Sequence, residues 1–226
     1  MRLYAHRGAS VEAPENTLAA FRLALDAGAD GIELDVHVSA DGVPVVIHDD
    51  RLERTTSGRG TVGDMTVDEL QRLDAGEGEW VPTLGEVIEL VGGRMLMDIE
   101  IKAPGVEAVT LASLAALEYD QWVVSSFDWD VLRNVRRMAP RAELWPLTWI
   151  ASDEAVAVAL EIEAPLLALR GEAIDEDIAT FLTGQDLGFM AWTVNDPRQA
   201  LTLEAFGATA ICTDDPRRIR SAVGSR

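Results

Sequence analysis

The stretch Gly31-Ile32-Glu33-Leu34-Asp35-Val36 decides the fold, because apolar side chains alternate in it with two carboxylates. Alternation with a period of two is the pattern of a β-strand, and it places both acids on one face. A second stretch, Met97-Asp98-Ile99-Glu100-Ile101-Lys102, repeats the pattern later in the chain. Charged residues are rarely buried unless they are paired. The two stretches therefore predict strands whose ends carry a site.

Short apolar runs alternate with helix-like stretches along the chain. The runs that we expect to be strands cover residues 3–6, 31–38, 94–102, 122–127, 143–149, 166–170, 188–195 and 208–213. The helical stretches between them include residues 14–28, 106–117, 129–138, 153–160, 175–182 and 197–206. This alternation is typical of a parallel sheet, and eight strands are the number that a barrel needs. We therefore predict an α/β fold, a TIM-like (β/α)8 barrel.

One apolar run, residues 43–48, does not fit the alternation. Only Ser39-Ala40-Asp41-Gly42 separates it from the second strand, which is too short for a parallel crossover. Asp-Gly is instead a hairpin signal, so this run should fold back over the barrel mouth. Residues 38–82 then form a small insertion after the second strand, with one short helix near 67–73. No linker or repeat divides the chain, and we expect one domain over residues 1–226.

The composition excludes several classes of partner. The 226 residues carry a net charge of −20 and have a pI of about 4.4, which disfavours nucleic acid and anionic membrane surfaces. The sequence has no transmembrane run, we expect no signal peptide, and the lone Cys212 cannot form an intrachain disulfide. We expect a cytoplasmic protein with no nucleic-acid partner and no stable membrane association. The composition leaves the oligomeric state open.

Seven ionisable residues fall at the expected carboxyl ends of the first three barrel strands or at the end of the hairpin run. They are His6, Arg7, Glu33, Asp35, His48, Glu100 and Lys102. Active sites of (β/α)8 barrels lie at these ends of the strands. Lys102 is the only lysine in the chain, which has eighteen arginines, and this contrast indicates a need for a compact ammonium group.

The acids of this set favour a metal site. Glu33 and Asp35 are two residues apart in a strand, about 7 Å along one face, and Glu100 adds a third carboxylate from the next strand. Oxygen ligands suit a hard divalent cation, Mg²⁺ or Ca²⁺. One alternative is a salt-bridge network with Arg7 and Lys102. Another is a pair of glycosidase carboxylates, which would leave the histidines and the cations without a role.

Cleavage of a phosphodiester would give each of these residues a role. A divalent cation offsets charge on the phosphoryl oxygens, and Arg7 and Lys102 add cationic donors. His6 and His48 would serve as the acid–base pair. Trp192, at the end of the seventh strand, is a core aromatic by default, but at a barrel mouth it could also pack against a polyol carbon skeleton.

Several nearby polar residues receive supporting roles. We expect His37 to face solvent or to support the site rather than to bind a ligand. Asp98 should support Glu100 or form a buried cap. Asp214 and Asp215 close the last strand, and we expect them to cap the final helix at Pro216.

The motifs, taken in order, resemble those of the glycerophosphodiester phosphodiesterase family. They are His6-Arg7-Gly8, Pro14-Glu15-Asn16-Thr17, Glu33-Leu34-Asp35-Val36, Asp41-Gly42, His48-Asp49, Arg54-Thr55-Thr56, Leu73-Asp74-Ala75-Gly76, Pro82-Thr83-Leu84, Glu100-Ile101-Lys102, Ser125-Ser126-Phe127, Trp192-Thr193-Val194-Asn195 and Thr213-Asp214. They span nearly the whole chain, and their order and spacing make the resemblance specific.

The resemblance implies a TIM-like barrel that hydrolyses small glycerophosphodiesters to an alcohol and sn-glycerol 3-phosphate. It implies one divalent cation held by Glu33, Asp35 and Glu100, with His6 and His48 as acid and base. Arg7, Lys102 and Trp192 would contact the substrate. Direct attack by water and a cyclic phosphate intermediate both remain open. A lysophospholipase D-type enzyme acting on lipids and a non-catalytic phosphodiester-binding protein are the alternatives.

Overall fold

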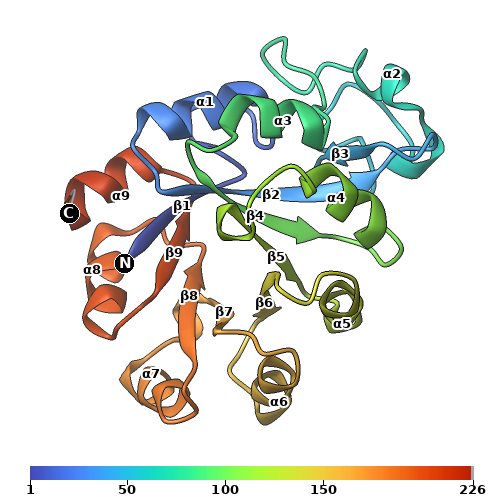
Figure 1. Ribbon diagram of the computed structural model, residues 1–226. Coiled ribbons are helices and arrows are strands. Elements are labelled where there is room, and N and C mark those ends of the chain that lie inside the picture. The colour runs from blue at the N-terminus through green and yellow to red at the C-terminus, as the bar shows by residue number, and fades with distance from the viewer. Residues whose placement is uncertain (225–226) are drawn as a thin grey trace.

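Eight parallel strands close into a barrel in the computed structural model, which describes residues 1–224 (Figure 1). In order around the barrel they are β1 (Arg2–His6), β2 (Gly31–Val38), β4 (Leu96–Ile101), β5 (Trp122–Ser126), β6 (Glu143–Thr148), β7 (Leu166–Arg170), β8 (Gly188–Trp192) and β9 (Ala210–Thr213). β1 pairs with β2 on one side and with β9 on the other, which closes the ring. The predicted (β/α)8 barrel is confirmed.

Helices surround the barrel, one after each strand (Figure 1). They are α1 (Leu18–Asp26), α3 (Leu84–Val91), α4 (Glu107–Leu114), α5 (Trp129–Met138), α6 (Asp153–Glu161), α7 (Glu176–Thr183), α8 (Pro197–Ala205) and α9 (Pro216–Val223). Short 3-10 turns lie at Val62–Asp64, Tyr119–Gln121 and Gly171–Ala173. Asp215 accepts a hydrogen bond from the Arg218 backbone at the start of α9, so its predicted capping role is confirmed. Within residues 1–224, every helix is too short or too polar to span a bilayer.

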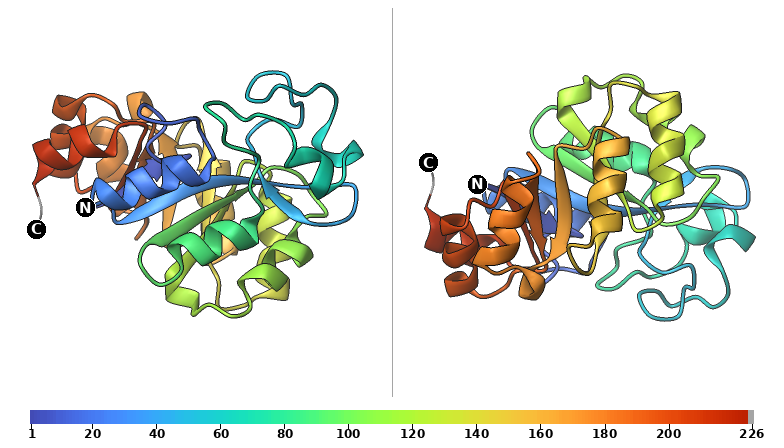
Figure 2. Two further views of the ribbon diagram at one scale, coloured as in Figure 1. Left: turned by 90° about the horizontal axis from the view of Figure 1, so that it is seen from above. Right: turned by 90° about the horizontal axis from the view of Figure 1, so that it is seen from below.

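The insertion after β2 begins with the predicted hairpin. Strand β3 (Pro44–Val46) pairs antiparallel with the end of β2, with Val46 opposite Val36. A short helix, α2 (Val67–Leu70), follows, and the insertion lies beside the barrel near α3 and α4 (Figures 1 and 2). Its apolar side chains form a small core of their own. That core consists of Val45, Ile47, Leu52, Val62, Leu70 and Val81.

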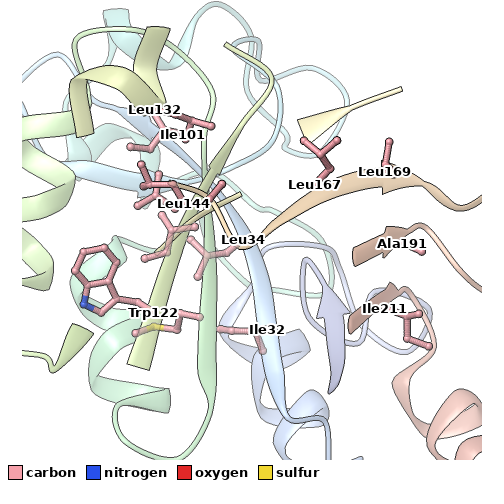
Figure 3. Close-up of a cluster of buried hydrophobic side chains, with 14 of the residues drawn as sticks. Ile32, Leu34, Ile101, Trp122, Leu132, Leu144, Leu167, Leu169, Ala191 and Ile211 are labelled. Carbon is pink, nitrogen blue, oxygen red and sulfur yellow. The ribbon is translucent and has the colours of Figure 1, made fainter. Parts of the chain in front are cut away.

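The period of two divides each strand between two environments. Ile32 and Leu34 of β2 belong to the large core between the barrel and its helices (Figure 3). Glu33 and Asp35 point the other way, into the barrel. The barrel interior below them is filled by a second, smaller apolar cluster that includes Tyr4, Trp145, Leu147, Met190 and Cys212. The free thiol of Cys212 is buried there, as its apolar surroundings in the sequence predict.

Loss of side-chain volume from the large core should destabilise the barrel. Leu167 on β7 is fully buried, so Leu167→Ala should lower the free energy of unfolding by about 2–5 kcal/mol through lost burial and a cavity. Leu201 on α8 is 46% exposed, and Leu201→Ala should change the free energy of unfolding by less than about 0.5 kcal/mol. Urea denaturation of both variants measures the difference. Equal effects would contradict this account of the core.

Candidate active site

Three buried carboxylates meet at the carboxyl ends of β2 and β4. Glu33 and Asp35 lie on β2, and the register of the two strands places Glu100 directly beside Asp35. One oxygen from each residue lies within 4.8 Å of the others, and all three side chains are buried. The structure thus brings together the three residues that the sequence proposes as metal ligands.

Two cationic side chains lie against this cluster. Lys102 Nζ is 2.6 Å from Glu100 Oε1 and 3.2 Å from Asp35 Oδ1. Arg7 Nε is 3.1 Å from Asp35 Oδ2, and the Arg7 backbone N–H donates to Glu33 Oε2 at 3.0 Å. Three carboxylates against two cations leave one uncompensated negative charge. The lone lysine of the sequence therefore lies between two of the predicted ligands.

The cluster fits a hard divalent cation. Burial, then the charges of Asp35 and Glu100, raise the pKa of Glu33 well above its usual value. Burial and the charge of Asp35 raise the pKa of Glu100 to about 7. Burial alone would raise the pKa of Asp35 as well. The positive charges of Lys102 and then Arg7 outweigh the effect of burial, and the pKa of Asp35 falls to about 2. Carboxylates that resist ionisation together are stabilised by a metal charge, and buried Asp35 Oδ1 accepts no hydrogen bond from the described residues.

His6 lies at the edge of the cluster and is oriented by the last strand. Its Nε2 is 3.9 Å from Glu33 Oε2, and its Nδ1 is 2.6 Å from Asp214 Oδ1. Asn195 and Ser10 donate hydrogen bonds to Asp214, at 2.6 and 3.2 Å. Since a carboxylate only accepts, Nδ1 of His6 carries the hydrogen and Nε2 is the atom turned to the site.

The sequence-based role of Asp214 as a helix cap is wrong. Asp215 alone caps α9, and Asp214 holds His6. The reason is closure of the barrel, which pairs β9 with β1 and so sets Asp214 beside the end of β1. Two residues distant in the chain become neighbours only through this pairing.

His48 follows β3 and is oriented in the same way. Its Nδ1 is 2.5 Å from Asp49 Oδ1, which again leaves Nε2 free. Burial lowers the pKa of His48, although Asp35 and Asp49 oppose this shift. His48 interacts electrostatically with Asp35, but it does not line the pocket that His6 borders.

The position predicted for His37 is wrong where it places the ring in solvent. The ring is partly buried, and its Nε2 lies 3.1 Å from the backbone oxygen of His48. Because a carbonyl only accepts, Nε2 of His37 donates this hydrogen bond. His37 therefore supports the backbone of His48, which matches the second role that the sequence suggests.

One arginine links the insertion to the barrel. Arg54 donates to Asp49 Oδ2 at 2.5 Å and to Glu15 Oε2 at 2.8 Å. Glu15 in turn accepts from Arg7 Nη1 at 2.9 Å, and Asp49 holds His48. A single guanidinium thus joins the carboxylate behind His48 to the carboxylate behind Arg7. Sequence reasoning treated Glu15 only as part of a helix start and gave Arg54 no role.

Asn16 is a further residue whose role the sequence did not reveal. Its Nδ2 donates to Asp35 Oδ2 at 2.7 Å from a backbone with a φ of 58°. Asparagine tolerates this left-handed conformation better than most residues. Thr17 next to it caps α1 by accepting from the Ala20 backbone, so the helix begins at Leu18, inside the predicted stretch 14–28, and Asn16 lies before it and can serve the site.

A pocket with an empty volume of about 380 Å³ opens beside the cluster. Its lining combines His6, Arg7, Glu33 and Glu100 with Trp192 and with Leu147, Met190 and Cys212 from the barrel interior. Asp98 and Ser125 also line this pocket: Ser125 donates to Asp98 Oδ1 at 2.6 Å, and burial raises the pKa of Asp98 to about 8. The lining of the pocket therefore combines ionisable groups with apolar side chains.

These features define a (β/α)8-barrel enzyme with an acidic, histidine-bearing mouth. The chain belongs to the glycerophosphoryl diester phosphodiesterase family, whose family model matches residues 6–218. The resemblance found in the sequence is therefore confirmed.

Individual relatives match the chain over almost its whole length. A glycerophosphodiester phosphodiesterase of Caldanaerobacter subterraneus subsp. tengcongensis is 38% identical over 233 residues, covering 97% of this chain and 96% of the relative. Among solved structures, an Oleispira antarctica phosphodiesterase in complex with the product sn-glycerol-3-phosphate has a TM-score of 0.94 and 31% identity, covering 100% of this chain and 97% of its own. A glycerophosphodiester phosphodiesterase of Thermotoga maritima has a TM-score of 0.84 and 27% identity, covering 97% and 96%.

The raised pKa values of the buried acids predict how pH affects stability. After chelation, the folded protein should hold protons on Glu33, Asp98 and Glu100 that the unfolded chain has released above about pH 4.5. Stability should then fall as pH rises from about 4.5 to the pKa of Glu100, about 7. Added Ca²⁺ or Mg²⁺ should raise the melting temperature more at pH 8 than at pH 5.

Thermal unfolding from pH 5 to 8, with and without cation, measures this effect. Glu100→Gln removes one of the titrating groups, so its melting temperature should depend less on pH and respond less to cation. An equal cation effect at pH 5 and pH 8 would contradict the electrostatic account.

The link through Arg54 predicts a loss of activity from a residue in the insertion. Arg54→Ala frees the carboxylates of Glu15 and Asp49, and kcat should fall by about 10- to 100-fold, the usual effect of removing a supporting partner. Arg51 is a matched control, because among residues 1–224 its guanidinium pairs only with exposed Glu53 in the same insertion. Steady-state kinetics should show normal turnover for Arg51→Ala. Unchanged kcat in Arg54→Ala would refute the linking role.

Proposed function

We propose that this protein hydrolyses small glycerophosphodiesters to an alcohol and sn-glycerol 3-phosphate with one divalent cation, Mg²⁺ or Ca²⁺. The observation that carries the proposal is the buried cluster of Glu33, Asp35 and Glu100 with His6 at its edge. When bound by these carboxylates, the cation would act as a Lewis acid toward a phosphoryl oxygen. It would also change the local net charge from minus one to plus one, which complements a singly charged phosphodiester.

The residues of the chain would bind and orient the phosphate. Arg7 and Lys102 are held in place by Asp35 and Glu100, and both would donate to the phosphate of a diester bound at the cluster. Charge-assisted hydrogen bonds from such groups are stronger than neutral ones. Trp192, which lines the pocket, would contact the carbon skeleton of the substrate.

The two histidines would move the protons. In each ring a carboxylate accepts from Nδ1, so that Nε2 can take or give a proton at the reacting oxygen. The lowered pKa of His48 favours the neutral ring near pH 7, which suits a base. This arrangement serves attack by water and attack by the neighbouring glycerol hydroxyl equally well.

Release of sn-glycerol 3-phosphate from glycerophosphocholine and glycerophosphoethanolamine tests the proposal. Activity should disappear after chelation and return with Mg²⁺ or Ca²⁺. His6→Ala and His48→Ala should each lose about 10²–10⁴-fold in kcat, because acid–base groups contribute by that amount.

Both histidine variants should keep the melting temperature of the wild type within a few degrees, which separates catalysis from folding. Turnover that survives chelation would overturn the role of the cation. Wild-type turnover in His6→Ala would overturn the acid–base assignment.

A further inference from the structure

Three aromatic rings stand together on the rim of the barrel mouth. Phe127 follows β5, Trp149 follows β6, and Trp192 ends β8. The ring centroid of Trp149 lies 5.5 Å from that of Phe127 and 5.1 Å from that of Trp192, and Phe127 and Trp192 are 5.4 Å apart. We call Phe127, Trp149 and Trp192 the aromatic shelf.

The aromatic shelf is open to solvent although its members are large and apolar. Trp149 is 57% exposed and Phe127 39%. Exposed apolar groups of this size, clustered beside a pocket, indicate a binding surface rather than a packing role. The core of the barrel does not need these two rings.

The shelf borders the pocket through Trp192. Trp192 lines the pocket together with His6, Glu33 and Glu100. In the ring of strands, β6 and β8 lie across the barrel from β1 and β4 (Figure 1). A phosphodiester held at the carboxylate cluster would therefore extend one of its two alcohol arms over the shelf.

The faces of these rings attract positive charge. The guanidinium carbon of Arg170 already lies 5.9 Å from the ring centroid of Trp149, within the range of a cation–π contact. Arg170 is paired with Glu172 at 2.9 Å, so its own charge is balanced at the rim. The net charge of −20 on the chain also favours a cationic arm over an anionic one.

We propose that the aromatic shelf binds the trimethylammonium group of a choline ester and makes glycerophosphocholine the preferred diester. This inference rests on the proposed function, since the shelf acts on the arm of a diester bound at the cluster. Aromatic faces recognise quaternary ammonium groups through their quadrupole, and the methyl groups bury apolar surface at the same time. An acyl chain, for which exposed Ile150 beside Trp149 would add area, is the other outcome of the test.

The experiment compares glycerophosphocholine with its neutral isostere, the 3,3-dimethylbutyl ester, in which carbon replaces the ammonium nitrogen. The measured quantity is the ratio of kcat/KM for the two esters. The wild type should favour the choline ester. Trp149→Leu keeps apolar area but removes the π face. It should lower this ratio about tenfold, because that factor corresponds to the free energy of a partly desolvated cation–π contact.

Two further variants separate an effect of the shelf from a folding defect. Phe127→Leu should lower the ratio in the same direction by a smaller factor. Phe181 on α7 is 37% exposed, nearly the same as Phe127, but it lies on the outer helical ring away from the mouth. Phe181→Leu should leave the ratio at the wild-type value.

Two results would overturn the proposal. A ratio that stays unchanged in Trp149→Leu and Phe127→Leu would exclude a cation site on the shelf. Equal losses on both esters would identify an apolar surface of the kind that an acyl chain would use.

The shelf can also be tested if the wild type hydrolyses neither ester, a result that would refute the proposed function itself. Saturation-transfer NMR with choline alone should then show contact with the methyl groups, lost in Trp149→Leu and kept in Phe181→Leu. Contact that is kept in both variants would overturn the shelf as a choline site.

Discussion

The structure depends on the burial of three carboxylates beside two cations at one end of the barrel. Glu33, Asp35 and Glu100 lie within 4.8 Å of one another, and Arg7 and Lys102 offset two of their charges. Buried charges are costly unless paired, so the barrel must hold these groups at short, defined distances. The uncompensated charge that remains is what makes the cluster a cation site in our proposal. A rigid parallel sheet, with its helices packed outside, supplies that precision.

His6 ends β1 and His48 follows β3, and a carboxylate orients each of the two rings. Asp214 at the end of β9 holds His6, and Asp49 in the insertion holds His48. Arg54 extends this support to Glu15 and Arg7, so the small insertion is tied to the barrel through charged groups. The insertion has its own apolar core, which lets its loop positions stay fixed. Orientation of the His6 ring is thus a property of the closed barrel, whereas Asp49 orients the His48 ring locally.

The mouth of the barrel has two unlike halves. Strands β1, β2 and β4 carry the ionisable groups, and β5, β6 and β8 end in Phe127, Trp149 and Trp192. A phosphodiester has a charged phosphate and two alcohol groups. In our proposal the ionisable residues bind the phosphate, and the aromatic rings bind one of the alcohol groups. The affinity for the phosphate and the choice of alcohol would then depend on different strands. Substitutions in the aromatic shelf could then alter the preference for one alcohol group over another without disturbing the carboxylate cluster.

The sequence by itself determined the barrel and the hairpin insertion, and it singled out the seven ionisable residues that we propose for the site. Strand periodicity, Asp41-Gly42 and the lone Lys102 are local signals, and each reflects one strand or turn. The Asp214 partner of His6, the link through Arg54 and the contact of Asn16 with Asp35 came only from the tertiary structure. Asp214 was mistaken for a cap because a carboxylate before a helix looks the same in either role. Which role it takes is decided by closure of the barrel, since only the pairing of β9 with β1 brings Asp214 to His6.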